Sequence, residues 1–295
     1  MGPRVVIVGA AGQLGSALVT ELQHGWTVVP LTRRDLDVTH AGAAATLAAL
    51  APDVIINTTA WNDVDGAEDD PAAAMLVNRD GAARLAEAAA ASGAACVHYS
   101  TDFVFDGRAA TPYAEDAVRT PLSAYGRSKA AGEDAVLRAP RAYVLRLSSV
   151  FGGRPGEGAG GRSTIDRITD ALCEGREVRA FADRTVSPSY TADVARATRE
   201  VLERRLPYGT YHCVSTGYTT WHVLAGEISR RLGIPGRILA TATGAVTLRA
   251  PRPQFCALSN ARLAAAGIAM PTWEDALARH LAQRAATASA RGVEL

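Results

Sequence analysis

The sequence predicts an α/β protein, a doubly wound parallel sheet with a smaller C-terminal lobe, and three observations lead to this fold class. A β-branched segment near the start runs directly into a glycine-rich turn. Apolar strand-like segments then alternate with alanine-rich helical stretches, and a chain of 295 residues is long enough for a large core. We expect the sheet domain over residues 1–150, with later segments returning to it, and the smaller lobe mainly over 151–295.

The first strand and turn predict a dinucleotide-binding site. Residues 4–8 read Arg-Val-Val-Ile-Val, which is typical of a buried parallel strand, and glycines follow at positions 9, 12 and 15. Such glycines let the backbone turn sharply, approach a diphosphate closely and pack the next helix on the strand. A helix expected over residues 13–23 then offers its unpaired N–H groups to the diphosphate. A glycine-rich turn that binds nothing is the alternative.

Four further strands are predicted over residues 27–31, 53–57, 95–99 and 142–147. Ligands of parallel sheets bind at the carboxyl ends of the strands, so polar residues directly after strands indicate a shared site. These polar residues are Asn57-Thr58-Thr59, Ser100-Thr101-Asp102 and Ser148-Ser149. Loops that are polar only for solvation are the alternative.

The end of the second strand bears on the choice of cofactor. An acidic residue there would bind the ribose 2′-hydroxyl of NAD, but Arg33 and Arg34 stand at this place. Guanidinium groups bind phosphates well, so a 2′-phosphate and hence NADPH is expected. Asp37 lies close enough in sequence to reach the adenine region, so NADH remains an alternative, as do two arginines that only solvate a loop.

Tyr125 and Lys129 are the candidate catalytic pair. Lys129 is the only lysine among 31 basic residues, and a spacing of four places it on the same helix face as Tyr125. A compact ammonium fits beside a phenol and a ribose where a planar guanidinium does not. Because a cation favours the phenolate, we expect the pKa of Tyr125 to lie below its usual value of ~10. A surface pair on an amphipathic helix is the alternative.

Composition excludes several classes of protein. The net charge of +1 and the scattered arginines argue against nucleic-acid binding. We also expect no membrane span and no secretion signal, hence a cytoplasmic protein. No cluster of residues at ligand spacing predicts a metal site. The four cysteines are far apart in sequence, which indicates reduced, mostly buried thiols rather than disulfides: Cys96, Cys173, Cys213 and Cys256.

Three motifs together resemble the extended short-chain dehydrogenase/reductase superfamily: the glycines at 9–15, the segment 98–107, and the Tyr125/Lys129 pair. Within this superfamily the chain is most similar to the dTDP-4-dehydrorhamnose reductase family. Further segments similar to that family are 57–68, Val77-Asn78, 215–222 and Arg252-Pro253. The resemblance implies a Rossmann-type sheet and a cofactor-dependent enzyme.

The family resemblance also implies a reaction, reduction of the C4 ketone of a 6-deoxy-4-keto-hexose on a thymidine diphosphate by a nicotinamide cofactor. Tyr125 would protonate the alkoxide, Lys129 would hold the nicotinamide ribose, and Thr101 would bind and orient the substrate oxygen. The implied cofactor-binding residues are Gly9, Gly12, Gln13, Leu14, Gly15, Arg33, Asp37, Val38, Thr59, Asn78, Tyr125 and Lys129. The implied substrate-binding residues are Asp102, Phe103, Ser149, Trp221 and Arg252.

Two positions depart from the family pattern. Phe103 stands where the family usually has tyrosine, and Ser149 stands where it commonly has a tryptophan that lies against the sugar. We therefore expect a different substrate wall and consider a related deoxysugar of natural-product biosynthesis. Dehydratases of the superfamily carry an Asp-Glu pair where this chain has Asp102-Phe103, so dehydration is disfavoured.

The second half yields fewer expectations. The glycine-rich segment 152–163 is expected to form a mobile loop, either a cover over the substrate or a surface insertion. Residues 188–190 and Trp221 are expected in the lobe that receives the nucleotide. Arg249 and Arg252 are candidates for binding the diphosphate, with Arg252 favoured because it matches the Arg-Pro pair of the family.

Two other functions fit the same fold. One is a non-catalytic, dinucleotide-binding subunit like the regulatory subunit of methionine adenosyltransferase, which the Thr101, Tyr125 and Lys129 set argues against. The other is a nucleotide-sugar epimerase that retains NAD, which Arg33 and Arg34 disfavour. The expected partner is a dTDP-sugar, and whether the chain is a monomer or a homodimer stays open.

Overall fold

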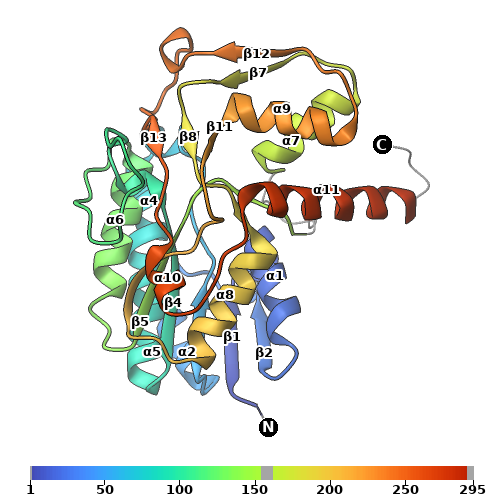
Figure 1. Ribbon diagram of the computed structural model, residues 1–295. Helices are drawn as coiled ribbons and strands as arrows, with labels where there is room; N and C mark the ends of the chain where they lie inside the picture. The colour runs from blue at the N-terminus through green and yellow to red at the C-terminus, as the bar shows by residue number, and fades with distance from the viewer. Residues whose placement is uncertain (1, 154–161, 291–295) are drawn as a thin grey trace.

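A six-stranded parallel sheet forms the centre of the molecule (Figure 1). The computed structural model describes residues 2–153 and 162–290. The strand order across the sheet is β10-β5-β4-β3-β1-β2. These strands are β1 (Arg4–Val8), β2 (Thr27–Leu31), β3 (Val54–Asn57), β4 (Ala95–Thr101), β5 (Ala142–Leu147) and β10 (Gly209–His212).

Helices cover both faces of this sheet. Successive residues of β1 show why: Val5 and Ile7 belong to the core on one face, and Val6 and Val8 to the core on the other. The first face packs against α1 (Gln13–Leu22), α8 (Thr191–Glu203) and α10 (Ala261–Ala265). The second packs against α2 (Ala43–Ala49), α5 (Ala82–Ser92) and α6 (Ala124–Val136). Three short elements precede α5 along the chain: α3 (Gly66–Asp69), α4 (Pro71–Met75) and the π-helical turn η1 (Leu76–Gly81).

The smaller lobe lies beyond the carboxyl ends of the strands, in the upper part of Figure 1. Its own core buries Trp221, Trp273 and Phe151 among residues of three helices. The helices are α7 (Thr164–Cys173), α9 (Trp221–Leu232) and α11 (Trp273–Ala290). The short strands are β6 (Val150–Phe151), β7 (Val178–Phe181), β8 (Thr185–Val186), β9 (Ser189–Tyr190), β11 (Thr219–Thr220), β12 (Ile238–Thr241) and β13 (Phe255–Cys256). The described residues also contain two 3-10 turns, η2 (Asp102–Val104) and η3 (Thr243–Ala245).

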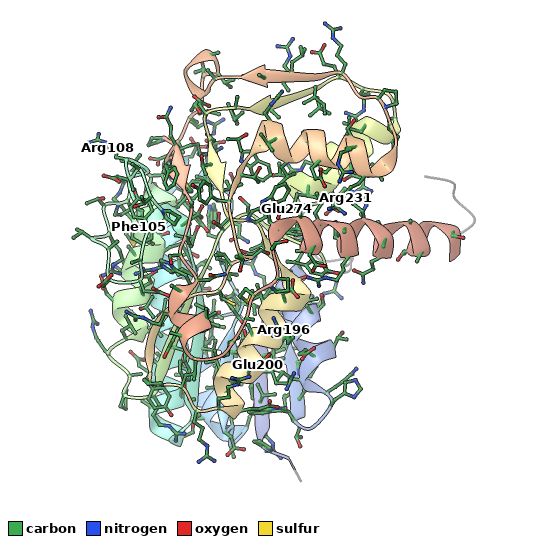
Figure 2. The ribbon with its side chains drawn as sticks, viewed as in Figure 1. Phe105, Arg108, Arg196, Glu200, Arg231 and Glu274 are labelled. Carbon is green, nitrogen blue, oxygen red and sulfur yellow. The ribbon has the colours of Figure 1, made fainter. Side chains whose placement is uncertain are left out.

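The chain crosses between the two lobes several times. Residues after 150 return to the large sheet as α8, β10 and α10, so the second half contributes to both lobes. On α8 the side chains of Arg196 and Glu200 form an ion pair, and Arg196 also donates to the Ala269 carbonyl, 2.8 Å away (Figure 2). This contact ties α8 to the segment that leads toward α11.

The Phe105-Asp106-Gly107 segment joins the sheet domain to the smaller lobe. Phe105 is buried and stacks on Tyr113, with ring centroids 4.2 Å apart. Gly107 has a φ of 73°, and a Cβ there would stand 2.5 Å from the backbone nitrogen of Gln254. Its carbonyl accepts a hydrogen bond from the Phe255 N–H, 3.0 Å away. Gly107 of the sequence motif therefore has a structural role at the lobe boundary.

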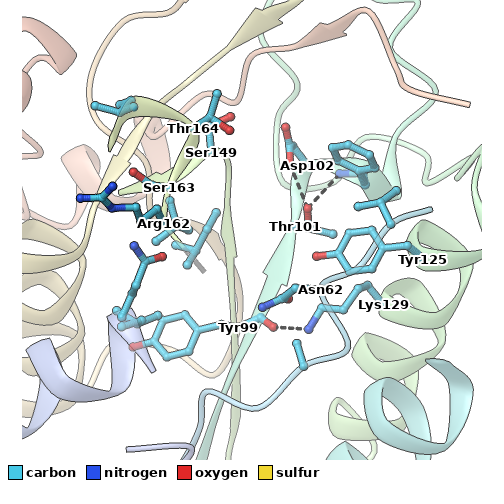
Figure 3. A pocket seen from close by; sticks show the side chains of 18 of the residues that line it. Asn62, Tyr99, Thr101, Asp102, Tyr125, Lys129, Ser149, Arg162, Ser163 and Thr164 are labelled. Atoms are coloured by element: carbon cyan, nitrogen blue, oxygen red, sulfur yellow. Dashed lines mark hydrogen bonds between the residues drawn. The ribbon is translucent and has the colours of Figure 1, made fainter. Parts of the chain in front are cut away.

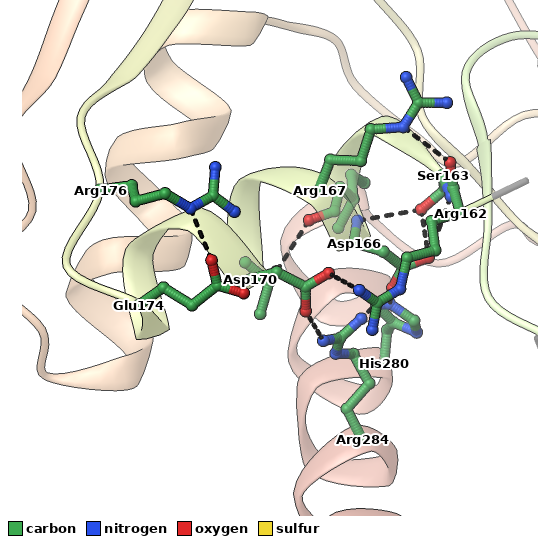
Figure 4. A network of polar contacts seen from close by, with 11 residues as sticks. Arg162, Ser163, Asp166, Arg167, Asp170, Glu174, Arg176, His280 and Arg284 are labelled. Carbon is green, nitrogen blue, oxygen red and sulfur yellow. Dashed lines mark hydrogen bonds and ion pairs between the residues drawn. The ribbon is translucent and has the colours of Figure 1, made fainter.

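A carboxylate at the start of α7 ties this helix to α11 (Figure 4). Asp166 forms a capping box with Ser163 and also lies 3.0 Å from His280 Nε2 of α11. Arg284 binds both Asp166 and Asp170. These contacts hold the pKa of the Asp166 carboxyl far below its usual value, although burial raises it. The first turn of α7 is therefore fixed by the C-terminal helix.

The predicted strands are confirmed with small differences. The strands expected at 4–8, 27–31 and 142–147 have those bounds, β3 begins one residue later, and β4 continues through Thr101. Residues 154–161, most of the segment expected to form a mobile loop, lie outside the described residues. No helix within residues 2–153 and 162–290 combines the length and apolarity that a membrane crossing needs.

Glycine in α6 permits a very close backbone approach. A Cβ on Gly126 would stand 2.4 Å from the Phe103 carbonyl oxygen in the segment after β4, a distance that forces a backbone shift. In α9, a Cβ on Gly226 would meet nothing within 4 Å.

We expect Gly126→Ala to destabilise the protein by about 1–3 kcal/mol, the usual cost of overpacking, and to impair ligand binding at the adjoining site. The matched variant Gly226→Ala should be neutral or stabilising by up to about 1 kcal/mol, because alanine favours helix. Denaturant unfolding of both variants measures the difference. Equal stabilities for the two variants would contradict the close-packing argument.

Candidate functional site

A cavity of about 710 Å³ lies at the carboxyl ends of the strands, between the sheet and the smaller lobe (Figure 3). Its walls come from the turn before α1, the ends of β3, β4 and β5, the helix α6, and the segments that begin α7 and end β7. Polar residues after three predicted strands therefore meet at one site: Thr58 and Thr59, Ser100 to Asp102, and Ser149.

The start of α1 forms one end of the cavity. Gly12, Gln13, Leu14 and Gly15 all line it, and Gly12 at the N-cap has no side chain that could satisfy the first N–H groups of the helix. A Cβ on Gly15 would stand 2.3 Å from the Gly9 carbonyl oxygen, so glycine is needed for the helix to start this close to β1. These donors at a positive helix end suit a diphosphate.

Five residues expected to bind the cofactor lie outside the cavity wall, and three of them cluster after β2. Arg33 is exposed, with its guanidinium 3.9 Å from the Asp37 carboxylate. Asp37 accepts hydrogen bonds from the Thr39 N–H and hydroxyl, which lower the pKa of its carboxyl. Val38 is buried in the core beneath. Of this group, only the side chains of Arg33 and Asp37 reach solvent.

Gly9 and Asn78 are not among the residues that line the cavity. Asn78 accepts a hydrogen bond from the Trp61 N–H at 2.8 Å and donates to the Ser128 hydroxyl at 2.8 Å. It is 1% exposed, so its side chain joins the loop after β3 to α6. Thr59, in contrast, is on the wall, with its hydroxyl donating to Asn57 Oδ1.

The three predicted catalytic residues line the same cavity. Thr101 ends β4, while Tyr125 and Lys129 project from successive turns of α6, whose N-cap is Ser123. The Lys129 ammonium donates to the Tyr99 carbonyl oxygen at 2.7 Å. Lysine is thus anchored at the strand end and keeps further N–H groups for a ligand.

The expected lowering of the pKa of Tyr125 does not appear in the structure. Burial raises the pKa of Tyr125 to about 12, outweighing a hydrogen bond with Thr101 that lowers it, and the Asp102 carboxylate raises it further. Burial also lowers the pKa of Lys129 to about 8, which weakens its ability to stabilise a phenolate. Tyr125 is therefore held protonated, the state that a proton donor requires.

The predicted substrate-side residues also reach the cavity. Phe103 packs edge-on against Tyr125, with ring centroids 5.6 Å apart. Ser149 has a φ of 46°, a strained conformation for a residue with a Cβ. Trp221 begins α9 and is largely buried. Arg252 donates to Asp65 Oδ2 at 2.9 Å, so this guanidinium bridges the two lobes. Arg249 pairs with Asp69 and is absent from the cavity wall.

Most charged groups on the wall are cationic, and the sequence did not single them all out. Among the residues that the structure describes, the lining cations are Lys129, Arg162, Arg167, Arg179, Arg184 and Arg252, and Asp102 provides the one lining carboxylate. The Arg184 guanidinium lies over the Phe181 ring, 5.5 Å from its centroid. In a chain so rich in arginine, only their convergence in space distinguishes these residues. The cationic wall suits ligands that carry several phosphates.

The parallel sheet, the uncapped helix start and the Thr-Tyr-Lys set define a nicotinamide-dependent oxidoreductase of the short-chain dehydrogenase/reductase type. The described residues contain no group of three His, Cys, Asp or Glu side chains arranged to hold a metal ion.

Comparison with known proteins resolves the family. The sequence profile described as "RmlD substrate binding domain" matches residues 3–286. A dTDP-4-dehydrorhamnose reductase from Streptomyces griseus is 36% identical over 93% of this chain and 92% of its own length. A probable dTDP-4,6-dihydroxy-2-methyloxan-3-one 4-ketoreductase from Streptomyces antibioticus is 39% identical over 93% of both chains.

A solved structure agrees. The dTDP-4-dehydrorhamnose reductase of Bacillus anthracis, in complex with NADP, superposes with a TM-score of 0.89 at 31% identity, covering 96% of this chain and 100% of the other. This chain therefore belongs to the dTDP-4-dehydrorhamnose reductase family.

We predict that Lys129→Met raises the free energy of unfolding at pH 7, because the native state no longer buries an ammonium. Burial lowers the pKa of Lys129 from 10.5 to about 8. Below pH 8 the buried ammonium therefore lowers the free energy of unfolding of the parent protein by its full amount. This destabilisation disappears as the pH rises to 10.5, because Lys129 loses its proton at a lower pH in the folded state than in the unfolded state. The difference in free energy of unfolding between Lys129→Met and the parent should therefore decrease as the pH rises from 8 to 10.5.

Denaturant unfolding at a series of pH values measures this gap. Arg138→Met, which removes an exposed cation just after α6, should show no such narrowing. A constant gap for Lys129→Met would contradict the burial of an ammonium.

Proposed function

We propose that this chain is an NADPH-dependent 4-ketoreductase that acts on a dTDP-4-keto-6-deoxyhexose, either dTDP-4-dehydrorhamnose or a related deoxysugar. One observation carries the proposal: Thr101, Tyr125 and Lys129 line a single cavity that also contains the uncapped start of α1. The names of the relatives in Streptomyces griseus and Streptomyces antibioticus support the reaction class.

The residues of the chain divide the work of reduction. The cofactor, when bound, supplies a hydride to the ketone carbon. Tyr125 is the proton donor, and burial keeps its proton in place until an alkoxide develops beside it. The Tyr99 carbonyl holds the Lys129 ammonium in place. The remaining N–H groups of this ammonium would bind the hydroxyl groups of the nicotinamide ribose. The helix start and the lining arginines bind the phosphates.

The wall of the sugar site supports a related deoxysugar as a variant of this substrate. Ser149 places a small hydroxymethyl group where the family commonly carries an indole, and Phe103 presents a ring without a hydroxyl. A wall that lacks the hydroxyl at position 103 and has more open space at position 149 leaves fewer polar groups unpaired when a sugar lacks a hydroxyl, so it discriminates less against such a sugar. A 2- or 3-deoxy analogue is the variant of the substrate that this wall supports.

The proposed reaction predicts NADPH oxidation that depends on a dTDP-4-keto-6-deoxyhexose, with Tyr125→Phe about 10²–10⁴-fold slower because the general acid is lost. Tyr218→Phe removes an exposed tyrosine hydroxyl and should leave the rate unchanged. Turnover is followed by the absorbance of the reduced nicotinamide, with dTDP-4-dehydrorhamnose and its 2- and 3-deoxy analogues compared. A clear preference for dehydrorhamnose would remove the deoxy variant.

Failure of the parent to oxidise NADPH with any of these sugars would contradict the proposed reaction. Co-purification with a partner enzyme would then support a regulatory subunit, and retention of NAD through purification would support an epimerase.

For the cofactor, we expect Arg33→Ala to raise the KM for NADPH by about 10-fold or more and to leave the KM for NADH unchanged. Arg33 is exposed at the end of β2 and only weakly held by Asp37, so it is free to bind a 2′-phosphate. Arg108→Ala, at another exposed arginine (Figure 2), is the control. Steady-state kinetics with both cofactors measure the effect, and equal changes for NADPH and NADH would exclude a 2′-phosphate contact.

A further inference from the structure

Arg184 is a cation on the cavity wall that the protein itself binds only in part. It stands between β7 and β8 and lines the cavity together with Phe181. The Arg184 Nε is buried and has no hydrogen-bond partner among the residues that the structure describes. We propose that Arg184 binds the diphosphate of the sugar nucleotide and makes the site selective for a ligand that carries this diphosphate.

The other lining cations are already bound by groups of the described chain. Three of them form ion pairs: Arg162 with Asp170 at 2.7 Å, Arg179 with Glu177 at 3.1 Å, and Arg252 with Asp65 at 2.9 Å. Two of them donate to backbone carbonyl oxygens: Lys129 to Tyr99 at 2.7 Å, and Arg167 to Arg162 at 3.1 Å. Among these cations, Arg184 therefore has the most to gain from a ligand.

Arg252, which the sequence favours for the diphosphate, has another partner in the structure. Its Nη2 donates to Asp65 Oδ2, and its Nη1 donates to the Ala250 carbonyl oxygen at 3.1 Å. Asp65 also accepts a hydrogen bond from the Ala250 N–H at 2.9 Å. A phosphate would have to compete with the Asp65 carboxylate for this guanidinium. Arg252 is therefore a weaker candidate for the diphosphate than Arg184.

The desolvation of the Arg184 guanidinium is not fully compensated. A buried N–H group that donates to no acceptor costs free energy. The Phe181 ring attracts the cation but accepts none of its strong hydrogen bonds. Burial lowers the pKa of Arg184, so the described charges around this group do not offset its desolvation. Because Arg184 is only half-buried, an anion in the cavity can reach the side chain and provide the missing compensation.

The backbone next to Arg184 is held in place before any ligand binds. Thr185 follows it and belongs to β8, the middle strand of the three-stranded sheet β11-β8-β13. The Thr185 N–H donates to the Gln254 carbonyl oxygen at 2.8 Å. A binding group on a fixed backbone loses less conformational freedom when its ligand arrives. The smaller lobe therefore presents Arg184 from a preorganised position.

Charge and position favour the diphosphate of the sugar nucleotide over other parts of the two ligands. A phosphate supplies negative charge and several acceptor oxygens, whereas a sugar hydroxyl supplies no charge to a desolvated cation. The cofactor diphosphate is expected at the start of α1 in the sheet domain, while Arg184 belongs to the smaller lobe. The identity of the ligand rests on the proposed function, but its binding is measurable without turnover.

The experiment compares two ligands that differ only in their phosphates. Calorimetry measures the binding of dTDP and of thymidine to protein saturated with NADPH, and cofactor fluorescence measures the binding of NADPH itself. Arg184→Met removes the charge and keeps most of the apolar length. We expect the affinity for dTDP to fall about 10- to 100-fold, the loss of a hydrogen bond between charged groups. The affinities for thymidine and NADPH should stay unchanged.

Arg237→Met is the matched control. It removes an exposed arginine of the same lobe, which pairs with Glu177 at 3.0 Å and is not among the residues that line the cavity. This variant should bind dTDP as the parent does. An equal loss of dTDP affinity in Arg237→Met would overturn the assignment, because long-range charge alone would then explain the effect.

Three further results would overturn the assignment of Arg184. Unchanged dTDP affinity in Arg184→Met would exclude a phosphate contact. Equal losses for dTDP and thymidine would indicate an indirect effect on the whole site. Weaker binding of NADPH, with dTDP affinity retained, would assign Arg184 to a cofactor phosphate instead.

Binding and turnover separate this assignment from the proposed activity. A parent that binds dTDP through Arg184 but reduces no ketone would reject the proposed activity and leave the diphosphate contact standing. Ketone reduction by a parent whose affinity for dTDP does not depend on Arg184 would reject the diphosphate contact alone. A parent that binds no dTDP would also reject this contact.

Discussion

The close approach of α6 to the segments beside it is the constraint on which the site depends. Gly126 leaves room for the Phe103 carbonyl, and a Cβ on Gly132 would stand 2.2 Å from the Asn78 carbonyl oxygen. Only with both contacts does the helix lie near enough for Tyr125 to neighbour Thr101 and for the Lys129 ammonium to reach the Tyr99 carbonyl. If α6 lay slightly farther from these segments, Tyr125 and Lys129 would no longer lie close to Thr101 and the Tyr99 carbonyl.

Burial then sets the chemistry of these side chains. The same desolvation that raises the pKa of Tyr125 lowers the pKa of Lys129, so both groups are driven toward their neutral forms. A neutral phenol is what a reductase needs, because the proton must remain available until hydride transfer creates an alkoxide. The cations on the described part of the wall are suited to the opposite charge, that of phosphate groups.

Several contacts between the two lobes lie beside the cavity. Arg252 binds Asp65 across the boundary, and Gly107 brings the loop after β4 against Phe255. Arg184 adds the positive charge that faces Asp102. Contacts between the two lobes therefore lie close to the cavity that Tyr125 lines, so the geometry of this cavity depends on both lobes.

The sequence by itself determined the strands of the sheet and the candidate catalytic pair, Tyr125 and Lys129. Residues 4–8 and 142–147 are apolar enough to be read as buried strands, and the spacing of Tyr125 and Lys129 fixes their common helix face. These features are local, since periodicity and spacing act over a few residues. Only the tertiary structure decided the protonation of Tyr125, the burial of Val38 and Asn78, and the place of Arg184 at the cavity, because desolvation and convergence depend on residues far apart in the chain.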